Sequence, residues 1–267
     1  MKAFSIDFVG ELALFKKNDA NDVVNTSYNF IHKPVILGMF GAICGYSGYA
    51  KSERYKKGKI EYRTFPEYYQ KLKHLKIAIA PFYKKPLKKV ITGFNDASGM
   101  GSNAGTWQVE DQILVGEPII KYRVYVLLPD DIDESLTLLR RKVKKGETEY
   151  LLYYGKNEFF AHYENYQEYQ AETMKESEIA VISSLIKKSE GYKICKPVVA
   201  SFDNFDPFSS AMTEDYMIFE NLPYDLDVNG YYLKDLFVLS SKPMQIEDTT
   251  GFYILKSNEE VKYAQFI

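Results

Sequence analysis

Side chains that can hold a phosphate gather just before an apolar segment near the N-terminus. Ammonium groups contact phosphates, and hydroxyls and amides offer the hydrogen bonds that position a nucleic-acid backbone. The residues of this kind are Lys16, Lys17, Asn25, Thr26, Ser27, Tyr28 and Lys33. Together they predict an anion-binding loop, with the lysines on phosphates and the hydroxyls and amide as hydrogen-bonding partners.

The apolar segment after this loop predicts a helix that begins near Pro34 and stops at Gly45, because proline suits the first turn and glycine the stop. It has no polar face, so we expect it to be buried. Gly38, Gly41 and Gly45 share one side, which predicts close approach of a sheet or another backbone. Its free N-terminal N–H groups would face the loop and attract an anion such as phosphate. A core helix without any ligand fits the same pattern.

Two further groups extend the predicted nucleic-acid path. One is a lysine-rich run whose side chains would contact phosphates, and the other is a glycine-rich loop that permits close approach to a backbone. Trp107 follows that loop and could stack on a base, although core burial is the commoner place for a tryptophan. The residues in these groups are Arg54, Lys56, Lys57, Lys59, Gly99, Gly101, Ser102 and Asn103. The glycine loop lacks the Gly-Lys-Ser/Thr of a phosphate-binding P-loop.

Charge is distributed unevenly along the 267 residues, although the net charge is only −2. Residues 46–92 carry 13 Lys and Arg against 3 Asp and Glu, whereas residues 196–267 carry 5 against 12. A basic block supplies the salt-dependent part of nucleic-acid binding, and an acidic block repels nucleic acid or docks on a basic protein. Both blocks also fit ordinary solvated surfaces.

Several classes of protein are disfavoured by composition. The three histidines are far apart and neither cysteine belongs to a Cys-x-x-Cys pair, so we expect no zinc site and no other metal or cofactor. Asp130, Asp131 and Asp133 are better explained as the start of a helix. No apolar run approaches the roughly 20 residues of a membrane span, and the N-terminus does not look like a signal peptide. A reducing cytoplasm is the simplest compartment.

The order of predicted elements favours an α+β fold with a ferredoxin-like core, which RNA-recognition modules also use. Capping boxes predict helices at 64–76 and 173–188, and Asp133 and Gly146 bracket a third. Asn229-Gly230 predicts a two-residue hairpin turn. We expect one domain over 1–195 with a basic insertion at about 46–112, and a small C-terminal β region over 196–267. The predicted strands are 3–8, 107–114 paired with 119–128, 150–154, 198–202, 216–219, 231–239 and 252–255.

Three segments together resemble a CRISPR-associated family, the Cas protein conventionally numbered five, of the repeat-associated mysterious protein (RAMP) superfamily. The first is Thr26-x-Tyr-x-Phe followed by Lys33-Pro-x-x-x-Gly-x-x-Gly-Ala-x-x-Gly. The second is Tyr154-Gly-Lys-Asn-Glu, similar to the family's Leu-Gly-Lys-Ser-Glu, and the third is Glu220-Asn-Leu-Pro. The match covers most of the chain except about 48–112, and it is most similar to the type I-B branch.

This resemblance implies a RAMP ferredoxin-like core with a thumb-like insertion, whose tip is the glycine loop, and a C-terminal antiparallel β extension. It further implies a non-catalytic, guide-RNA-binding subunit of a type I CRISPR surveillance (Cascade) complex in antiviral defence. Such a subunit caps the 5′ handle of the CRISPR RNA (crRNA), packs against the backbone and large subunits, and meets target DNA through the assembled complex.

Two alternatives remain at the sequence level. A metal-independent endoribonuclease that processes CRISPR repeat RNA needs a base, an acid and a cation, for which the candidates are His32 or His74, Tyr28 or Tyr46, and Lys33 or Lys76. The type I-C branch cuts RNA with a Tyr-Lys-His set, and the nearest match here, Lys121-Tyr122, has no imidazole. The second alternative is an adaptor that docks a partner through its acidic C-terminal block.

Overall fold

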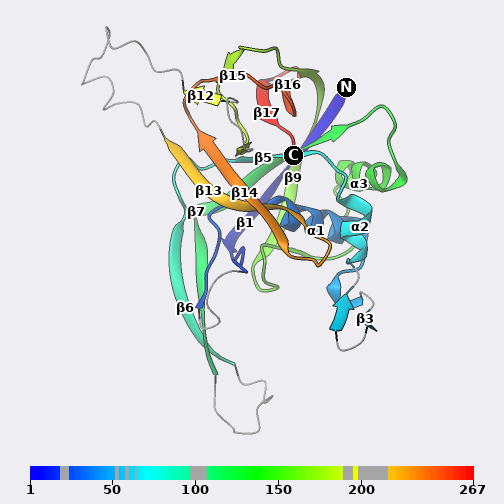
Figure 1. Cartoon of the computed structure of the whole chain (residues 1–267), viewed down its shortest axis with the longest axis vertical. Helices are drawn as coiled ribbons and strands as arrows, with labels where there is room; N and C mark the ends of the chain where they lie inside the picture. The colour runs from blue at the N-terminus through cyan, green and yellow to red at the C-terminus, as the bar shows by residue number, and fades with distance from the viewer. Residues whose placement is uncertain are drawn as a thin grey trace, which may run out of the picture.

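Strand β1 (Lys2–Ala13) contains the predicted strand 3–8 and lies in the middle of the main sheet, where both of its faces are buried. The computed structural model describes residues 1–18, 24–51, 54–57, 60–63, 65–96, 107–188, 195–197 and 216–267. Phe4, Ile6 and Phe8 point to one face and are fully buried, while Ser5 and Asp7 point to the other. The fold is mixed α+β and consists mostly of sheet (Figure 1).

β1 pairs antiparallel with β7 (Trp107–Leu128) on one side and with β9 (Phe160–Thr173) on the other. β7 also pairs with β5 (Ile77–Pro81) through its second half and with β6 (Lys88–Asp96) through its first. Among the described residues the strand order therefore runs β9, β1, β7, β5 through the centre of the sheet. The chain visits these strands in the order β1, α1, β5, β7, α3, β9.

The long strand β7 differs from the sequence prediction of two strands paired with each other. It continues through Gly116, Glu117 and Pro118, the residues that separate the two predicted strands. A local irregularity absorbs these residues instead: β1 shifts register between Gly10 and Leu12, opposite that stretch. As a result β6 and the first half of β7 extend together away from the rest of the molecule (Figure 1).

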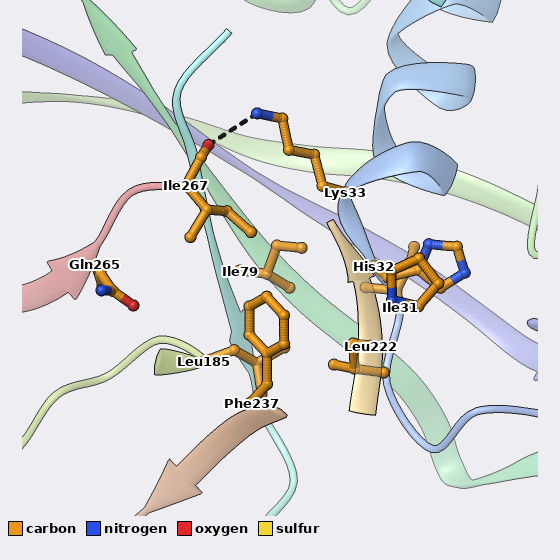
Figure 2. Close-up of a pocket in the computed structure, with 10 residues that line it drawn as sticks. Ile31, His32, Lys33, Ile79, Leu185, Leu222, Phe237, Gln265 and Ile267 are labelled. Atoms are coloured by element: carbon orange, nitrogen blue, oxygen red, sulfur yellow. Dashed lines mark hydrogen bonds between the residues drawn. The ribbon is translucent and has the colours of Figure 1, made fainter. Parts of the chain in front are cut away.

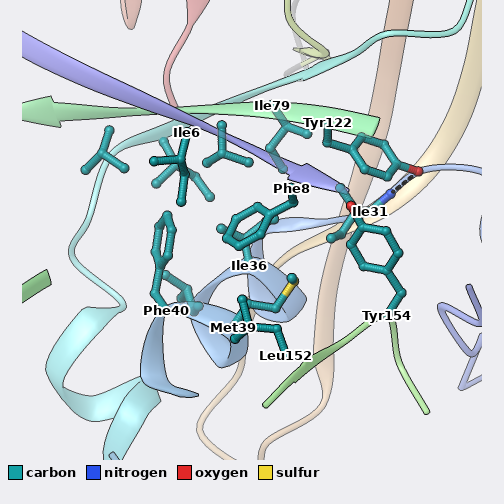
Figure 3. Packing of buried hydrophobic residues seen from close by; sticks show 14 of the residues in the cluster. Ile6, Phe8, Ile31, Ile36, Met39, Phe40, Ile79, Tyr122, Leu152 and Tyr154 are labelled. Atoms are coloured by element: carbon teal, nitrogen blue, oxygen red, sulfur yellow. Dashed lines mark hydrogen bonds between the residues drawn. The ribbon is translucent and has the colours of Figure 1, made fainter. Parts of the chain in front are cut away.

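Helices α1 (Lys33–Cys44), α2 (Glu67–Leu72) and α3 (Glu134–Lys145) contribute to one apolar core on a single face of the sheet. Phe8 of β1, Phe40 of α1 and Tyr122 of β7 lie together in this core (Figure 3). The other face holds a smaller cluster around Tyr125 and Tyr169. The helices therefore cover the face toward which the even-numbered residues of β1 point.

Both ends of α1 agree with the sequence prediction, since Pro34 lies in the first turn and Gly45 adopts a left-handed conformation (φ 86°) at the C-cap. The close approach predicted at the glycine stripe occurs at Gly41, where a Cβ would overlap the Cβ of Tyr68 on α2. The neighbour is thus a helix rather than a sheet. Gly38 is less crowded, because its Cβ would lie 3.9 Å from the Tyr68 ring.

α3 was also predicted correctly, because its caps are local in sequence. Asp133 accepts a hydrogen bond from the N–H of Leu136, and Gly146 closes the C-terminus in a left-handed conformation. Thr64, which begins the predicted capping box of α2, lies outside the described residues, and Glu67 accepts hydrogen bonds from the N–H and hydroxyl of Ser47. α2 is shorter than predicted and ends at Leu72.

The predicted helix over 173–188 is wrong. Thr173 ends β9, and the chain continues into β10 (Ile179–Ala180) and β11 (Ile186–Lys188). Both short strands pair with strands from the C-terminal quarter of the chain, so non-local pairing overrides the local helix signal. The remaining short elements are β2 (Val24–Asn25), η1 (Tyr49–Lys51), β3 (Arg54–Lys57), β4 (Ile60–Arg63), β8 (Leu152–Tyr153), β12 (Cys195–Pro197) and β15 (Met244–Ile246).

The C-terminal region is antiparallel, as predicted, and it adds to the main sheet. β16 (Phe252–Lys256) pairs with β9 and with β17 (Val261–Gln265), while β13 (Met217–Leu226) and β14 (Tyr232–Ser240) form a separate hairpin. The turn of this hairpin, residues 228–230, is one residue longer than predicted, and Gly230 at its end is left-handed. The predicted strand 198–202 lies outside the described residues.

None of the helices in the described ranges has the length and apolarity needed to cross a bilayer.

Candidate nucleic-acid interface

The predicted anion-binding loop closes on itself through main-chain hydrogen bonds. Lys17 N–H donates to the Thr26 carbonyl over 2.8 Å, and Tyr28 N–H donates to the Phe15 carbonyl over 2.9 Å. The Ser27 hydroxyl is fully buried, accepts from Phe15 N–H and donates to the Tyr28 carbonyl. Ser27 therefore shapes the loop from inside rather than offering a hydroxyl to a ligand.

A buried carboxylate fixes the second arm of this loop. Asp111 of β7 accepts a hydrogen bond from Asn25 Nδ2 over 2.7 Å and forms an ion pair with Lys156 Nζ at 2.6 Å. Lys156 also contacts the exposed Glu158 at 2.9 Å. The predicted hydrogen-bonding amide of Asn25 is thus occupied by the protein itself. Thr26 is half-buried and Lys16 is exposed.

Glu220 of β13 anchors the loop from the other side. Its buried carboxylate accepts hydrogen bonds from the main-chain N–H groups of Asn29 and Phe30 and from Asn29 Nδ2, at 2.9–3.2 Å. Lys17 Nζ lies 3.9 Å from the same carboxylate. Burial raises the pKa of Glu220, and the hydrogen bonds and lysine charges counter part of that rise. Through these hydrogen bonds, which we call the carboxylate latch, the segment that resembles the family's Glu-x-Leu-Pro holds the C-terminal hairpin against the loop.

Three lysines from distant parts of the chain meet above this latch, and we call Lys17, Lys89 and Lys234 the lysine cluster. Lys17 Nζ and Lys234 Nζ lie 5.3 and 5.8 Å from the centroid of the Tyr28 ring, within cation–π range. Lys89 Nζ donates to the Ser27 carbonyl over 3.0 Å, and burial lowers its pKa. The buried carboxylate of Glu220 thus lies near the charges of Lys17 and Lys89, while Lys234 shares the Tyr28 ring with Lys17.

Lys33, predicted to contact phosphate, points elsewhere. Its half-buried ammonium donates to the main-chain carbonyl of Ile267 over 3.0 Å, across a small apolar pocket (Figure 2). Burial lowers the pKa of Lys33 to about 8, although Asp225 partly counters this shift. Lys33 is therefore not part of the lysine cluster, even though Lys17 and Lys33 flank the same loop in the sequence.

His32 caps α1 and is buried between two rings. Its imidazole lies 5.3 Å from Tyr28 and 5.4 Å from Tyr232, both edge-on. Within the described part of the chain, no atom forms a hydrogen bond with its Nδ1. Burial, with a smaller contribution from Lys234, lowers the pKa of His32 to about 3, so the ring is neutral at pH 7. His74 is half-exposed and lies 2.9 Å from Asp133.

The other predicted site residues are only partly described. Arg54, Lys56 and Lys57 lie on β3, which pairs with β4, and Trp107 begins β7. The predicted contacts at Lys59, Gly99, Gly101, Ser102 and Asn103 lie outside the described residues. The described residues contain no group of three or more His, Cys, Asp or Glu placed to hold a metal ion.

The sequence prediction did not include Lys89, Lys234, Asp111 or Glu220 in the site. Lys89 was counted only as part of the basic block, and Lys234 lies in the acidic block, where a lone lysine gives no signal. Glu220 stands in a segment that resembles the family, which is the one sequence feature that could have pointed to it. Lys156 stands in another such segment, whose Gly155 is left-handed (φ 87°) with Leu14 O packed against it.

A solved structure resembles this arrangement over almost the whole chain. It is the crystal structure of a CRISPR protein from Archaeoglobus fulgidus, with a TM-score of 0.50 and 11% identity, over 99% of this chain and 100% of that one. The two chains share a fold. Weaker matches are a chain of a CRISPR RNA-guided surveillance complex (TM-score 0.47, 9% identity, 90% of this chain and 91% of that one) and a chain of a type III-B Cmr-beta complex bound to cognate target RNA (0.44, 15%, 90% and 86%).

The likeness to the Archaeoglobus protein covers both the main sheet and the C-terminal hairpin, because it extends over the full length of each chain. At 11% identity it is a likeness of fold alone. No protein-family model matches the sequence, and neither does any curated protein.

Proposed function

We propose that this protein is a non-catalytic, RNA-binding subunit of a CRISPR complex. The observation that carries the proposal is the lysine cluster, in which three lysines converge over a loop held rigid by buried Glu220. The fold shared with a CRISPR protein supports it. More specifically, we propose that the subunit belongs to a type I Cascade complex of the I-B branch. There it caps the 5′ handle of the crRNA and contacts the backbone and large subunits.

The topology supports a RAMP ferredoxin-like core for this subunit. Antiparallel strands in the order β9, β1, β7, β5, with α1 after β1 and α3 after β7, have the βαββαβ arrangement of that core. The extended pair of β6 and β7 would be the thumb-like projection. RNA would then pass between this projection and α1, where Lys89 of β6 and Lys17 of β1's following loop meet.

The cluster suits a nucleic-acid backbone better than a small anion. Its three ammonium groups come from three separate elements, since Lys17 follows β1, Lys89 lies on β6 and Lys234 lies on β14. A protein that neutralises phosphates releases counterions, and each contact to a single strand contributes about 0.7 to the slope of log K against log salt. The rigid carboxylate latch keeps the lysines gathered before RNA arrives, which lowers the entropic cost of binding.

The histidines support a binding role over cleavage of repeat RNA. A general base works best with a pKa near the operating pH, whereas burial holds the pKa of His32 at about 3. Its ring is also enclosed by Tyr28 and Tyr232. His74 lies beside the N-cap Asp133 of α3. The burial and low pKa of His32 therefore make it a poor general base for RNA cleavage.

The test compares a triple variant Lys17→Gln, Lys89→Gln, Lys234→Gln with the unmodified protein on labelled repeat RNA in EDTA, over a series of salt concentrations. We expect at least tenfold weaker binding, a salt slope smaller by about 2, and intact RNA throughout. A control variant that carries the same charge change at exposed Lys144, Lys145 and Lys175 should keep both affinity and slope.

Three results would count against the proposal. Discrete cleavage, lost on His32→Ala or His74→Ala, would favour the endoribonuclease. Equal losses in the triple variant and its control would mean that the lysine cluster is not the interface. No RNA binding even at low salt would favour an adaptor that docks a partner through its acidic C-terminal block.

A further inference from the structure

A second surface feature lies next to the lysine cluster, on the exposed side of α1. It is a groove of about 660 Å³. The helix contributes Pro34, Val35, Gly38, Met39 and Ala42 to its lining, and the tyrosines that line it are Tyr46, Tyr49, Tyr68, Tyr150, Tyr153 and Tyr232. This volume falls in the range of sites that hold small ligands.

The rim of this groove leaves large apolar side chains in contact with water. Tyr49 is 44% exposed, Tyr150 is 49% exposed and Leu151 is 73% exposed. Exposed apolar surface gathered around a concave site marks a place where something binds. Tyrosine in particular offers a flat face for stacking and tolerates water at its hydroxyl.

The groove is continuous with the lysine cluster through β14. Tyr232 lines the groove, and Lys234, two residues further along the same strand, belongs to the cluster. Between them lies His32, whose ring contacts both Tyr232 and Tyr28. A chain bound along the cluster would therefore reach the groove without crossing another element.

Charge on the groove's flank favours an anionic ligand. Residues 46–51 supply one wall of the groove, and Lys51 is among them. Lys71 Nζ lies 4.6 Å from the centroid of the Tyr46 ring, at the same wall. An apolar, tyrosine-lined groove beside basic residues matches the two parts of a nucleotide, its base and its phosphate.

We propose that this groove receives unstacked bases of the same single-stranded RNA whose phosphates lie on the lysine cluster. This inference rests on the proposed function and adds where the bases go. Stacking on aromatic side chains is tolerant of sequence, because every base has a flat face, and removing one such side chain typically weakens binding about tenfold. The two surfaces thus divide the work: the lysines set the salt dependence, and the tyrosines set an affinity that depends on the bases.

The experiment uses Tyr49→Ala and Tyr150→Ala, singly and together, in the full chain, with repeat RNA and with the same RNA carrying abasic positions in the bound segment. We expect the double variant to bind intact RNA at least tenfold more weakly with an unchanged salt slope. The difference between variant and unmodified protein should vanish on the abasic RNA. Tyr150→Phe should retain affinity, because the ring is kept.

Tyr231→Ala is the matched control, since Tyr231 is 70% exposed on the β13–β14 turn and does not line the groove. Its affinity should equal that of the unmodified protein. Salt-sensitive binding that is the same for Tyr49→Ala, Tyr150→Ala and the control would overturn the base groove while leaving the proposed function standing. If those variants instead lose a co-expressed partner subunit and keep RNA, the groove is a protein-docking site. A complete lack of RNA binding would remove both proposals.

Discussion

Glu220 and Asp111 show how single buried carboxylates organise the candidate interface. Each accepts hydrogen bonds from the loop and lies beside a lysine, Lys17 for Glu220 and Lys156 for Asp111. A buried carboxylate without such partners would be strongly destabilising, so the loop and the carboxylates stabilise each other. The basic surface is therefore positioned by acidic residues beneath it, which a count of net charge does not show.

His32 gives a pH-dependent contribution to stability at the same scale. Its folded pKa of about 3 is below its ordinary value of 6.5, so in this interval the unfolded chain binds more protons than the folded one. Stability therefore falls as the pH drops from about 6.5 toward 3. Between pH 7 and pH 5 the protein should lose about 2 kcal/mol more than His32→Phe, which keeps an aromatic ring between Tyr28 and Tyr232.

Urea unfolding of both proteins at pH 7, 6 and 5 measures this difference. His162→Phe is the control, because His162 is 65% exposed in its side chain and its substitution should leave the pH profile unchanged. Parallel profiles for His32→Phe and the unmodified protein would show that His32 is not kept neutral by burial.

At the scale of elements, the contact of α1 with α2 is set by one glycine. A Cβ at Gly41 would overlap the Cβ of Tyr68, an atom tied to the α2 backbone, whereas a Cβ at Gly38 would make an ordinary contact with the ring at 3.9 Å. Both positions lie inside the same helix, where alanine is preferred to glycine by up to about 1 kcal/mol. The two substitutions therefore differ mainly in packing.

We expect Gly41→Ala to lower the free energy of unfolding by about 2 kcal/mol, because α2 must move away, and Gly38→Ala to leave it unchanged or raise it by up to about 1 kcal/mol. Chemical denaturation of the pair, with CD at 222 nm as the readout, tests this. Similar effects from both substitutions would mean that α2 does not pack closely on Gly41.

At the scale of the whole molecule, the C-terminal quarter closes the fold. β16 and β17 extend the main sheet from β9, and Leu222, Leu226 and Phe237 of the β13–β14 hairpin belong to the same apolar core as α1. Glu220 adds a polar contact to the N-terminal loop. The predicted boundary near residue 195 therefore separates segments that share one core.

A chain limited to residues 1–195 should accordingly fail to unfold as a single cooperative unit, because it exposes the apolar surface that this quarter covers. Thermal and urea unfolding of the fragment measure this, and co-expression of residues 196–267 should restore a cooperative transition. A fragment as stable and cooperative as the full chain would establish the predicted boundary as a real one.

The elements that could be predicted from the sequence are those defined by local signals. α1 and α3 have their start and stop residues within one turn of their ends, and residues 3–8 of β1 alternate between apolar and small or polar side chains. The helix predicted over 173–188 had a local signal as well, but partners from β14 and β15 draw that segment into strands. The sequence also did not predict that β7 is a single strand. Gly116 and Pro118 are typical of a break between strands, and only the pairing of β1 with both halves of β7 shows that the strand continues.

The α+β class, the buried helix with its caps and the basic block can all be predicted from the sequence, because each depends on neighbouring residues. Which charges form a surface depends on the folded arrangement of distant segments. The fold turns Lys33 inward to Ile267, and it gathers Lys17, Lys89 and Lys234 over Tyr28. Those three lysines are brought together by sheet pairing and by the buried carboxylate of Glu220, and contacts between residues so far apart along the chain exist only once the sheet has closed.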